Sequence, residues 1–214
     1  MIIIIITLFI FFLINIIVYW QIVLKQKIGF NKFNKLYKKA FPIIWFISTT
    51  LIPIINSSFF QPFFEENISY FHQYWLWFML IGIIIIIFGI KILSLIKKLL
   101  KAANIEETGH NLIKTGVYEI ARHPQYFSWI LIYLGITFIL DSFIAIITIP
   151  ILLILTELLC FLEEKYLLIP KFGENYDRYK KKTPYKLISP PYNYIFIIMG
   201  LIVAYIGFLN IINI

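Results

Sequence analysis

The stretch that decides the fold runs from Tyr126 to Leu162 and reads YFSWILIYLGITFILDSFIAIITIPILLILTELLCFL. It holds two apolar segments, Tyr126–Leu140 and Phe143–Leu162, separated only by Asp141-Ser142. Aspartate and serine favour turns, so the stretch predicts two helices joined in a tight hairpin. A helix needs about 20 apolar residues to cross the hydrocarbon core of a membrane, so the second segment is long enough and the first is slightly short.

Hydrophobic residues make up 61% of the 214 residues, more than a soluble domain of this size can bury. Strands of a membrane barrel would be shorter and would alternate apolar with polar residues, a pattern that is absent. Four further apolar stretches lie outside the hairpin, and they are Ile2–Leu24, Phe41–Phe60, Phe71–Ile96 and Tyr192–Ile212. The expected fold is all-α, a single-domain polytopic membrane bundle over 1–214 with about six transmembrane helices.

Basic residues are concentrated in three alternate connections between these stretches. Six fall between Lys25 and Lys39, five between Lys97 and Arg122, and seven between Lys165 and Lys186. The other connections carry Glu65-Glu66 and Asp141 and no basic residue. By the positive-inside rule, the basic connections are cytoplasmic and both termini lie outside. Topology and anionic headgroups therefore account for the net charge of +8, and nucleic acid is not an expected partner.

Lys91 and Glu157 are ionisable residues inside expected spans. Burying either one alone is costly, so each should face protein or water. Two arrangements are open. The two side chains pair with each other, or Lys91 extends towards the lipid headgroups.

Two cytoplasmic connections hold most of the remaining polar residues. In the first, Arg122-His123-Pro124 predicts the start of a helix, because proline is favoured in the first helical turn. The unpaired N–H groups of that turn, with Arg122 beside them, suit a carboxylate or a phosphate. On the second helix of the hairpin, Glu157 and Glu164 are seven residues apart and share a face, whereas Glu163 is expected to point away. The predicted meeting of charges suits a functional site or a structural ion pair.

Three motifs occur in order along these connections. They are His110-x-Leu112-x-x-x-Gly116-x-Tyr118, Arg122-His123-Pro124-x-Tyr126, and Glu163-Glu164 followed by Phe172-Gly173-x-x-Tyr176-x-x-Tyr179. In this combination the chain resembles the isoprenylcysteine carboxyl methyltransferase and phospholipid methyltransferase superfamily. The resemblance covers roughly Gly82 to Ile188, and Tyr192–Ile212 is an additional span beyond the usual end of the family.

The resemblance implies a membrane-embedded methyltransferase with a pocket for S-adenosylmethionine at the cytoplasmic face. It implies two catalytic residues, Arg122 to orient the substrate or an anionic end of the cofactor, and Glu164 to hold the cofactor's amino end. The implied acceptor is a lipophilic or lipidated molecule from the membrane, with a prenylcysteine-type carboxylate or a lipid amine. The implied lining of the cofactor pocket consists of His110, Asn111, Leu112, Ile113, Tyr118, His123, Pro124, Gln125 and Tyr126.

The two acceptor classes make different demands. A carboxylate is already ionised and needs only orientation, whereas an amine must lose a proton, for which Glu157 or Glu164 is the candidate. Membrane burial is expected to raise the pKa of such a carboxyl. Cys160 stands where prenylcysteine methyltransferases of the family often carry an arginine, which counts against that acceptor.

Two other readings stay open. Membrane sterol reductases related to this superfamily share the Arg-His-Pro-x-Tyr motif and a closing stretch similar to Pro184-Tyr185-Lys186, and they bind a reduced nicotinamide cofactor. They usually have an acidic residue where Ser128 follows here, and they generally lack the Glu163-Glu164 pair. A non-catalytic membrane protein that keeps the fold is the third reading.

Overall fold

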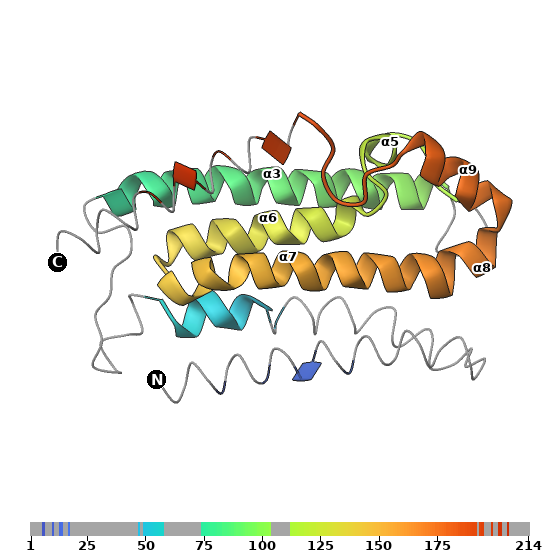
Figure 1. The fold of residues 1–214 in the computed structure, drawn as a ribbon. Coiled ribbons are helices and arrows are strands. Elements are labelled where there is room, and N and C mark those ends of the chain that lie inside the picture. Colours follow the sequence, from blue (N-terminus) through green and yellow to red (C-terminus); the bar gives the residue numbers. More distant parts are fainter. Residues whose placement is uncertain are drawn as a thin grey trace.

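The computed structural model describes residues 49–57, 74–103 and 112–191, together with residues 6, 10, 13, 14, 17, 47, 193, 194, 198, 201, 202 and 205. Every regular element in this described part is a helix, and no strand occurs in it (Figure 1). The expected all-α class is therefore confirmed for these residues. The spans expected at Ile2–Leu24, Phe41–Phe60 and Tyr192–Ile212 lie largely or partly outside the described residues. His110 and Asn111 lie outside them as well.

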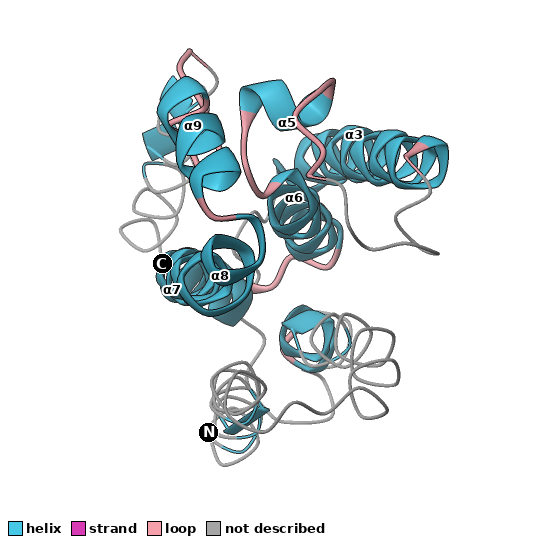
Figure 2. Ribbon diagram, turned by 90° about the vertical axis from the view of Figure 1, so that its right-hand side faces the viewer, coloured by secondary structure: helices cyan, strands magenta, loops and turns pink. Residues whose placement is uncertain are grey.

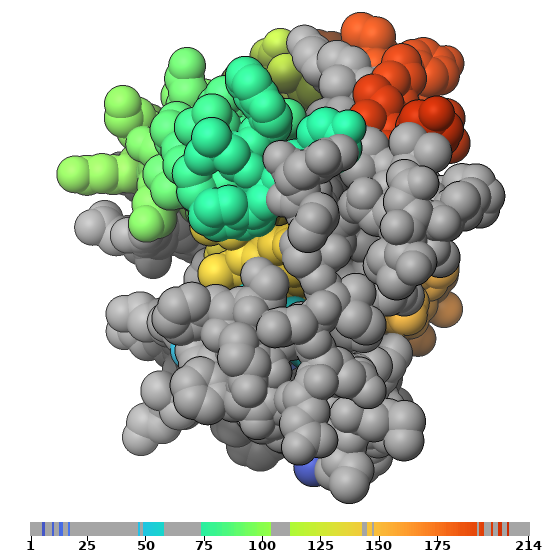
Figure 3. Space-filling view, turned by 90° about the vertical axis from the view of Figure 1, so that its left-hand side faces the viewer, coloured from blue at the N-terminus to red at the C-terminus, as the bar shows by residue number. Residues whose placement is uncertain are grey.

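Helix α3, Trp75–Ala102, is the one helix in the described ranges that is long and apolar enough to cross a membrane. Only 17% of its most apolar window of 18 residues is buried. Trp77, Ile84 and Ile87 are more than half exposed, and Figure 3 shows the green side chains of this helix standing out from the surface. The core helix of a soluble protein would be covered instead, so contact with lipid fits α3. The other five spans stay predictions.

Helix α6, Pro124–Ile139, lies between α3 and α7, Phe143–Glu163 (Figure 2). Gly82 on α3 and Gly135 on α6 allow the two backbones to approach closely. A Cβ atom built on either glycine would lie 2.6 Å from the carbonyl oxygen of the other. Small residues at such contacts are a usual means of packing helices in membranes.

The predicted hairpin between α6 and α7 is present. Asp141 turns the chain with a positive φ of 47°, and the Ser142 hydroxyl caps α7 by accepting a hydrogen bond from the N–H of Ala145 at 3.4 Å. Across the hairpin, the Tyr133 and Thr148 hydroxyls are hydrogen bonded at 2.7 Å. These polar groups are buried, and their mutual bonds fix the two helices side by side.

Four short elements gather at the opposite end of the hairpin (Figure 1). They are α5 at Val117–Ile120, the π-helical η3 at Glu164–Leu168, α8 at Ile169–Phe172 and α9 at Glu174–Lys182. Residues 183–188, here called the closing segment, follow α9. The backbone N–H groups of Arg122 and His123 donate hydrogen bonds to the carbonyls of Tyr185, at 3.0 Å, and Lys186, at 2.8 Å. The closing segment is thereby attached to the start of α6.

Candidate active site

A buried ion pair between Arg122 and Glu164 lies at the centre of the candidate site. The Arg122 Nε atom donates to Glu164 Oε1 at 2.8 Å, and Nη2 donates to Oε2 at 3.4 Å. The two side chains are only 2% and 4% exposed. Two parallel hydrogen bonds of this kind fix both the distance and the orientation of the charged groups. The end of α7 is thereby attached to the residue that precedes α6.

The same guanidinium also holds the closing segment. Its Nη1 atom donates to the carbonyl oxygens of Thr183, at 2.7 Å, and Pro184, at 2.6 Å. A guanidinium has five N–H donors, and four hydrogen bonds are formed here. Among the described residues, the fifth donor, on Nη2, therefore has no acceptor and could serve a ligand. Arg122 acts first as a positioning residue that joins α6, α7 and the closing segment.

His123 lies between two carboxylates. Its Nε2 atom is 3.0 Å from Glu164 Oε1, and its Nδ1 atom is 3.5 Å from Glu163 Oε2. Burial alone would lower the pKa of His123, but the hydrogen bonds with Glu163 and Glu164 and the charges of these groups outweigh it and raise the pKa above its ordinary value of 6.5. The raised pKa favours the charged form of His123, in which both ring nitrogens carry a proton.

The carboxylate of Glu164 is hydrogen bonded to both Arg122 and His123. Burial would raise the pKa of this carboxyl, yet the hydrogen bonds from His123 and Arg122 and their charges lower it from 4.5 to about 2. The expectation of a raised pKa is therefore wrong for Glu164, because its interactions with Arg122 and His123 more than compensate for the lost hydration. Glu164 is ionised at neutral pH and is a poor proton acceptor.

The position of Glu163 also differs from the prediction. It was expected to point away from Glu164, but it lies against His123 with its side chain 29% exposed. Burial and the charge of Glu163 together raise the pKa of Tyr118 to about 12. This carboxylate therefore acts on Tyr118 of the first motif as well as on His123 of the second. The helical-wheel argument fails because α7 ends here and the wider π-helical turn η3 begins. The adjacent Glu163-Glu164 pair was the available signal that both carboxylates serve one site.

Glu157 has a partner that the sequence did not suggest. Its Oε2 atom is 2.8 Å from Nζ of Lys186 in the closing segment. Within the described residues no ion pair joins Glu157 to Lys91, so the pairing considered for those two is not formed. Lys91 is exposed on α3, and its extension towards the lipid headgroups stays a prediction.

Comparison with known proteins agrees with these motifs. Residues 73–174 match the family model described as phospholipid methyltransferase. Protein-S-isoprenylcysteine O-methyltransferase from Xenopus laevis is 32% identical over 117 residues, which is 50% of this chain and 40% of that protein. Both similarities are to the isoprenylcysteine carboxyl methyltransferase and phospholipid methyltransferase superfamily, and they cover about half of this chain. It spans less than half the length of that relative, and no solved structure matches it significantly.

The structure places most of the pocket residues inferred from the superfamily near this cluster. The ring of Tyr126 lies 5.9 Å from that of His123 and 5.6 Å from that of Trp129, measured between centroids. The Tyr118 carbonyl accepts a hydrogen bond from the Tyr179 hydroxyl at 2.7 Å. Pro124 is buried as the first residue of α6, and Gln125, which follows it, is half-buried. Leu112 and Ile113 are half-buried as well, and their place in the pocket stays a prediction.

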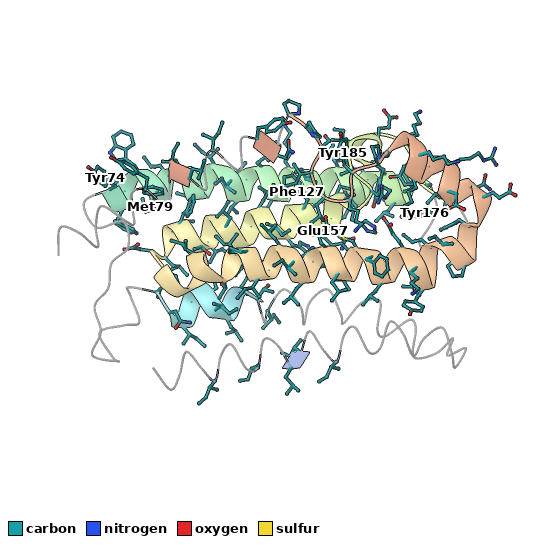
Figure 4. The ribbon with its side chains drawn as sticks, viewed as in Figure 1. Tyr74, Met79, Phe127, Glu157, Tyr176 and Tyr185 are labelled. Atoms are coloured by element: carbon teal, nitrogen blue, oxygen red, sulfur yellow. The ribbon has the colours of Figure 1, made fainter. Side chains whose placement is uncertain are left out.

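Tyr176 on α9 is a further member of the cluster to which the superfamily pattern gave no role (Figure 4). It is 1% exposed, and its hydroxyl is buried without a well-oriented hydrogen-bond partner in the described part of the chain. Burial, followed by the charge of Glu164 and a hydrogen-bonding contact with it that falls short of good geometry, raises the pKa of this hydroxyl. A buried polar atom without a partner is rare in folded proteins and indicates a place where a ligand or a water is received.

Proposed function

We propose that this protein transfers a methyl group from S-adenosylmethionine to a lipophilic acceptor at the cytoplasmic face of a membrane. The acceptor carries a prenylcysteine-type carboxylate or a lipid amine. The observation that carries the proposal is the convergence of Arg122, His123 and Glu164 near the hydroxyl of Tyr176, which has no well-oriented hydrogen-bond partner among the described residues. Similarity to the superfamily over about half of the chain supports methyl transfer as the reaction.

The residues present fit this cofactor. The buried hydroxyl of Tyr176, which makes no well-oriented hydrogen bond in the described part of the chain and lies near Glu164, suits the ammonium group of the cofactor's amino acid end. The remaining N–H donor of Arg122 suits its carboxylate. The half-buried rings of Tyr118 and Tyr126 suit a sulfonium, since aromatic faces attract cations. The other implied lining residues belong to the same proposed pocket.

The bound cofactor supplies an activated methyl group on a sulfonium, and its transfer by in-line displacement needs no metal. The protein contributes position and exclusion of water. Arg122 and His123 keep Glu164 ionised and fixed, so this carboxylate binds a cation and does not take a proton. For an amine acceptor, the partly exposed carboxylates of Glu163 and Glu157 are the groups that could take the proton.

The proposal includes the membrane topology. Six spans place the basic connections in the cytoplasm and both termini outside, within one domain. Two features support this arrangement. The apolar side chains of α3 face outwards, and the lysine-rich helix α9 lies at the same end of the bundle as the basic C-terminal end of α3 (Figure 1). The candidate site is at this basic end.

Calorimetry on the detergent-solubilised protein tests the proposal. We expect micromolar binding of S-adenosylhomocysteine and no binding of NADPH. Glu164→Ala should abolish binding, but it also removes the partner of Arg122, so Tyr176→Phe is the cleaner change. It deletes a hydroxyl that makes no well-oriented hydrogen bond within the described residues, and it should weaken binding about tenfold with little loss of thermal stability.

Tyr179→Phe is the matched control, because its hydroxyl bonds the Tyr118 carbonyl inside the protein. It should cost stability and leave the affinity nearly unchanged. NADPH binding without S-adenosylhomocysteine binding would replace the proposal with the reductase reading, and binding of neither would leave a non-catalytic protein.

A further inference from the structure

The ion pair between Lys186 and Glu157 differs from the buried cluster in its exposure. Its two side chains are 26% and 47% exposed, whereas those of Arg122 and Glu164 are almost completely covered. Glu157 lies seven residues before Glu164 on α7, which places it about 10 Å further along the helix axis. Figure 4 labels Glu157 on α7 and Tyr185, the neighbour of Lys186, on the closing segment.

The surroundings of the pair on α7 are apolar. Ile154, Leu158 and Phe161, which lie three residues before, one after and four after Glu157, are 68%, 43% and 48% exposed. In the proposed topology these side chains face lipid. Charged groups at this depth are costly in hydrocarbon unless a polar group meets them, and for this reason they usually mark a path for substrates or ions.

The Lys186 ammonium has capacity for a second partner. It has three N–H donors, and within the described residues it makes one hydrogen bond, to Glu157 Oε2. Its backbone is part of the site, because the carbonyl of Lys186 accepts the hydrogen bond from the His123 N–H. The ammonium is therefore held at a fixed place relative to the cluster while its own side chain stays partly open.

We propose that Lys186 is a specificity-determining residue that binds the acidic group of the acceptor, a carboxylate or a phosphate, in exchange for Glu157. This inference rests on the proposed function, and it adds which residue binds the acidic group of the acceptor. Arg122 is less suited to that task, since its side chain is 2% exposed and four of its donors are engaged. A lipid whose chains lie against the exposed face of α7 meets Lys186 with its polar end before it reaches the cluster.

The exchange predicts effects of opposite sign for the two partners. Lys186→Gln removes the cation and should raise the KM for the acceptor about tenfold, because a hydrogen bond between charged groups is lost. Glu157→Gln removes the competing carboxylate and should lower that KM. Lys186→Arg should stay near the wild-type value. None of these changes should alter the affinity for S-adenosylhomocysteine.

The measurement is methyl transfer from labelled S-adenosylmethionine in detergent, with two probes offered separately. N-acetyl-S-farnesylcysteine carries a carboxylate, and phosphatidylethanolamine carries a phosphate, so the responding probe identifies the acidic group. Lys181→Gln, an exposed lysine of α9, is the matched control and should change nothing.

A purely structural ion pair would give the same rise in KM for Lys186→Gln and Glu157→Gln, and this result would overturn the proposal. An unchanged KM in Lys186→Gln would do so too. A wild-type protein that binds S-adenosylhomocysteine but methylates neither probe would refute this inference and leave the cofactor assignment standing. Failure to bind S-adenosylhomocysteine would count against the proposed function itself.

Discussion

His123 and Glu164 stabilise the fold over opposite ranges of pH. The pKa of Glu164 is lowered from 4.5 to about 2, so its contribution is present above pH 4.5 and is lost as the pH falls towards 2. This shift corresponds to about 3 kcal/mol. The pKa of His123 is raised above 6.5, so its contribution is complete below pH 6.5 and is lost as the pH rises through the raised value. Thermal stability in detergent should therefore be highest between pH 4.5 and 6.5.

His123→Asn separates the two effects, because it leaves the pair between Arg122 and Glu164 in place. The variant should lose the fall in stability on the alkaline side and keep a smaller fall on the acid side, because Arg122 alone then lowers the pKa of Glu164. Glu174→Gln, on the exposed face of α9, is the control and should keep both. An alkaline fall of the same size in His123→Asn would show that another group causes it.

The contacts between individual residues show where the sequence was informative. The sequence predicted that Arg122 and Glu164 lie at the same end of the hairpin. Arg122 comes just before the first helix of the hairpin, and Glu164 comes at the end of the second. Lys186 could not be assigned to Glu157, since a chain with no regular element connects it to α9 and no periodicity fixes its place. The orientation of Glu163 depends on a π-helical turn, which has no distinctive residue pattern.

Close packing between helices α3 and α6 depends on the glycines at their contact, where a side chain would not fit. A Cβ atom on Gly135 would lie 2.5 Å from Ile86 Cγ1 and 2.6 Å from the carbonyl oxygen of Gly82. Gly135→Ala should therefore destabilise the protein by about 2 kcal/mol through overpacking, although alanine favours helix by about 1 kcal/mol. Ile87→Ala is the control on the exposed face of α3 and should change stability by no more than about 0.5 kcal/mol. Chemical unfolding in mixed micelles would measure both variants. If Gly135→Ala were as stable as the wild-type protein, the close contact between α3 and α6 would not limit the size of residue 135.

The helices themselves were more predictable than their contacts. Asp141-Ser142 marked the hairpin and Pro124 marked the start of α6, because turn residues and an initial proline act locally. The predicted end of the third apolar stretch at Ile96 was too early, since α3 continues to Ala102 through three lysines. Lysine is a good helix former, so the end of hydrophobicity was not the end of the helix.

At the scale of the whole molecule, α3 separates two ends with different chemistry. Its 28 residues span about 42 Å, more than the roughly 30 Å of a hydrocarbon core, so its ends should lie on opposite sides of the membrane. Tyr74 is exposed at one end, and Lys101 and Lys181 are exposed at the end that carries the candidate site. Cys160 is completely buried, so the wild-type thiol should give little background in labelling experiments.

Single cysteines at these three positions test the topology. A maleimide that cannot cross membranes should label Tyr74→Cys in intact cells, whereas Lys101→Cys and Lys181→Cys should react only after the membrane is permeabilised. The expectation follows from the lysines near both of the latter positions, which are retained on the cytoplasmic side. If Lys101→Cys and Lys181→Cys reacted from opposite sides, α3 and α9 could not belong to one cytoplasmic site, and the proposed access of a membrane-bound acceptor to a cytosolic cofactor would fail. If they reacted together from outside, the site would be intact but separated from cytosolic S-adenosylmethionine.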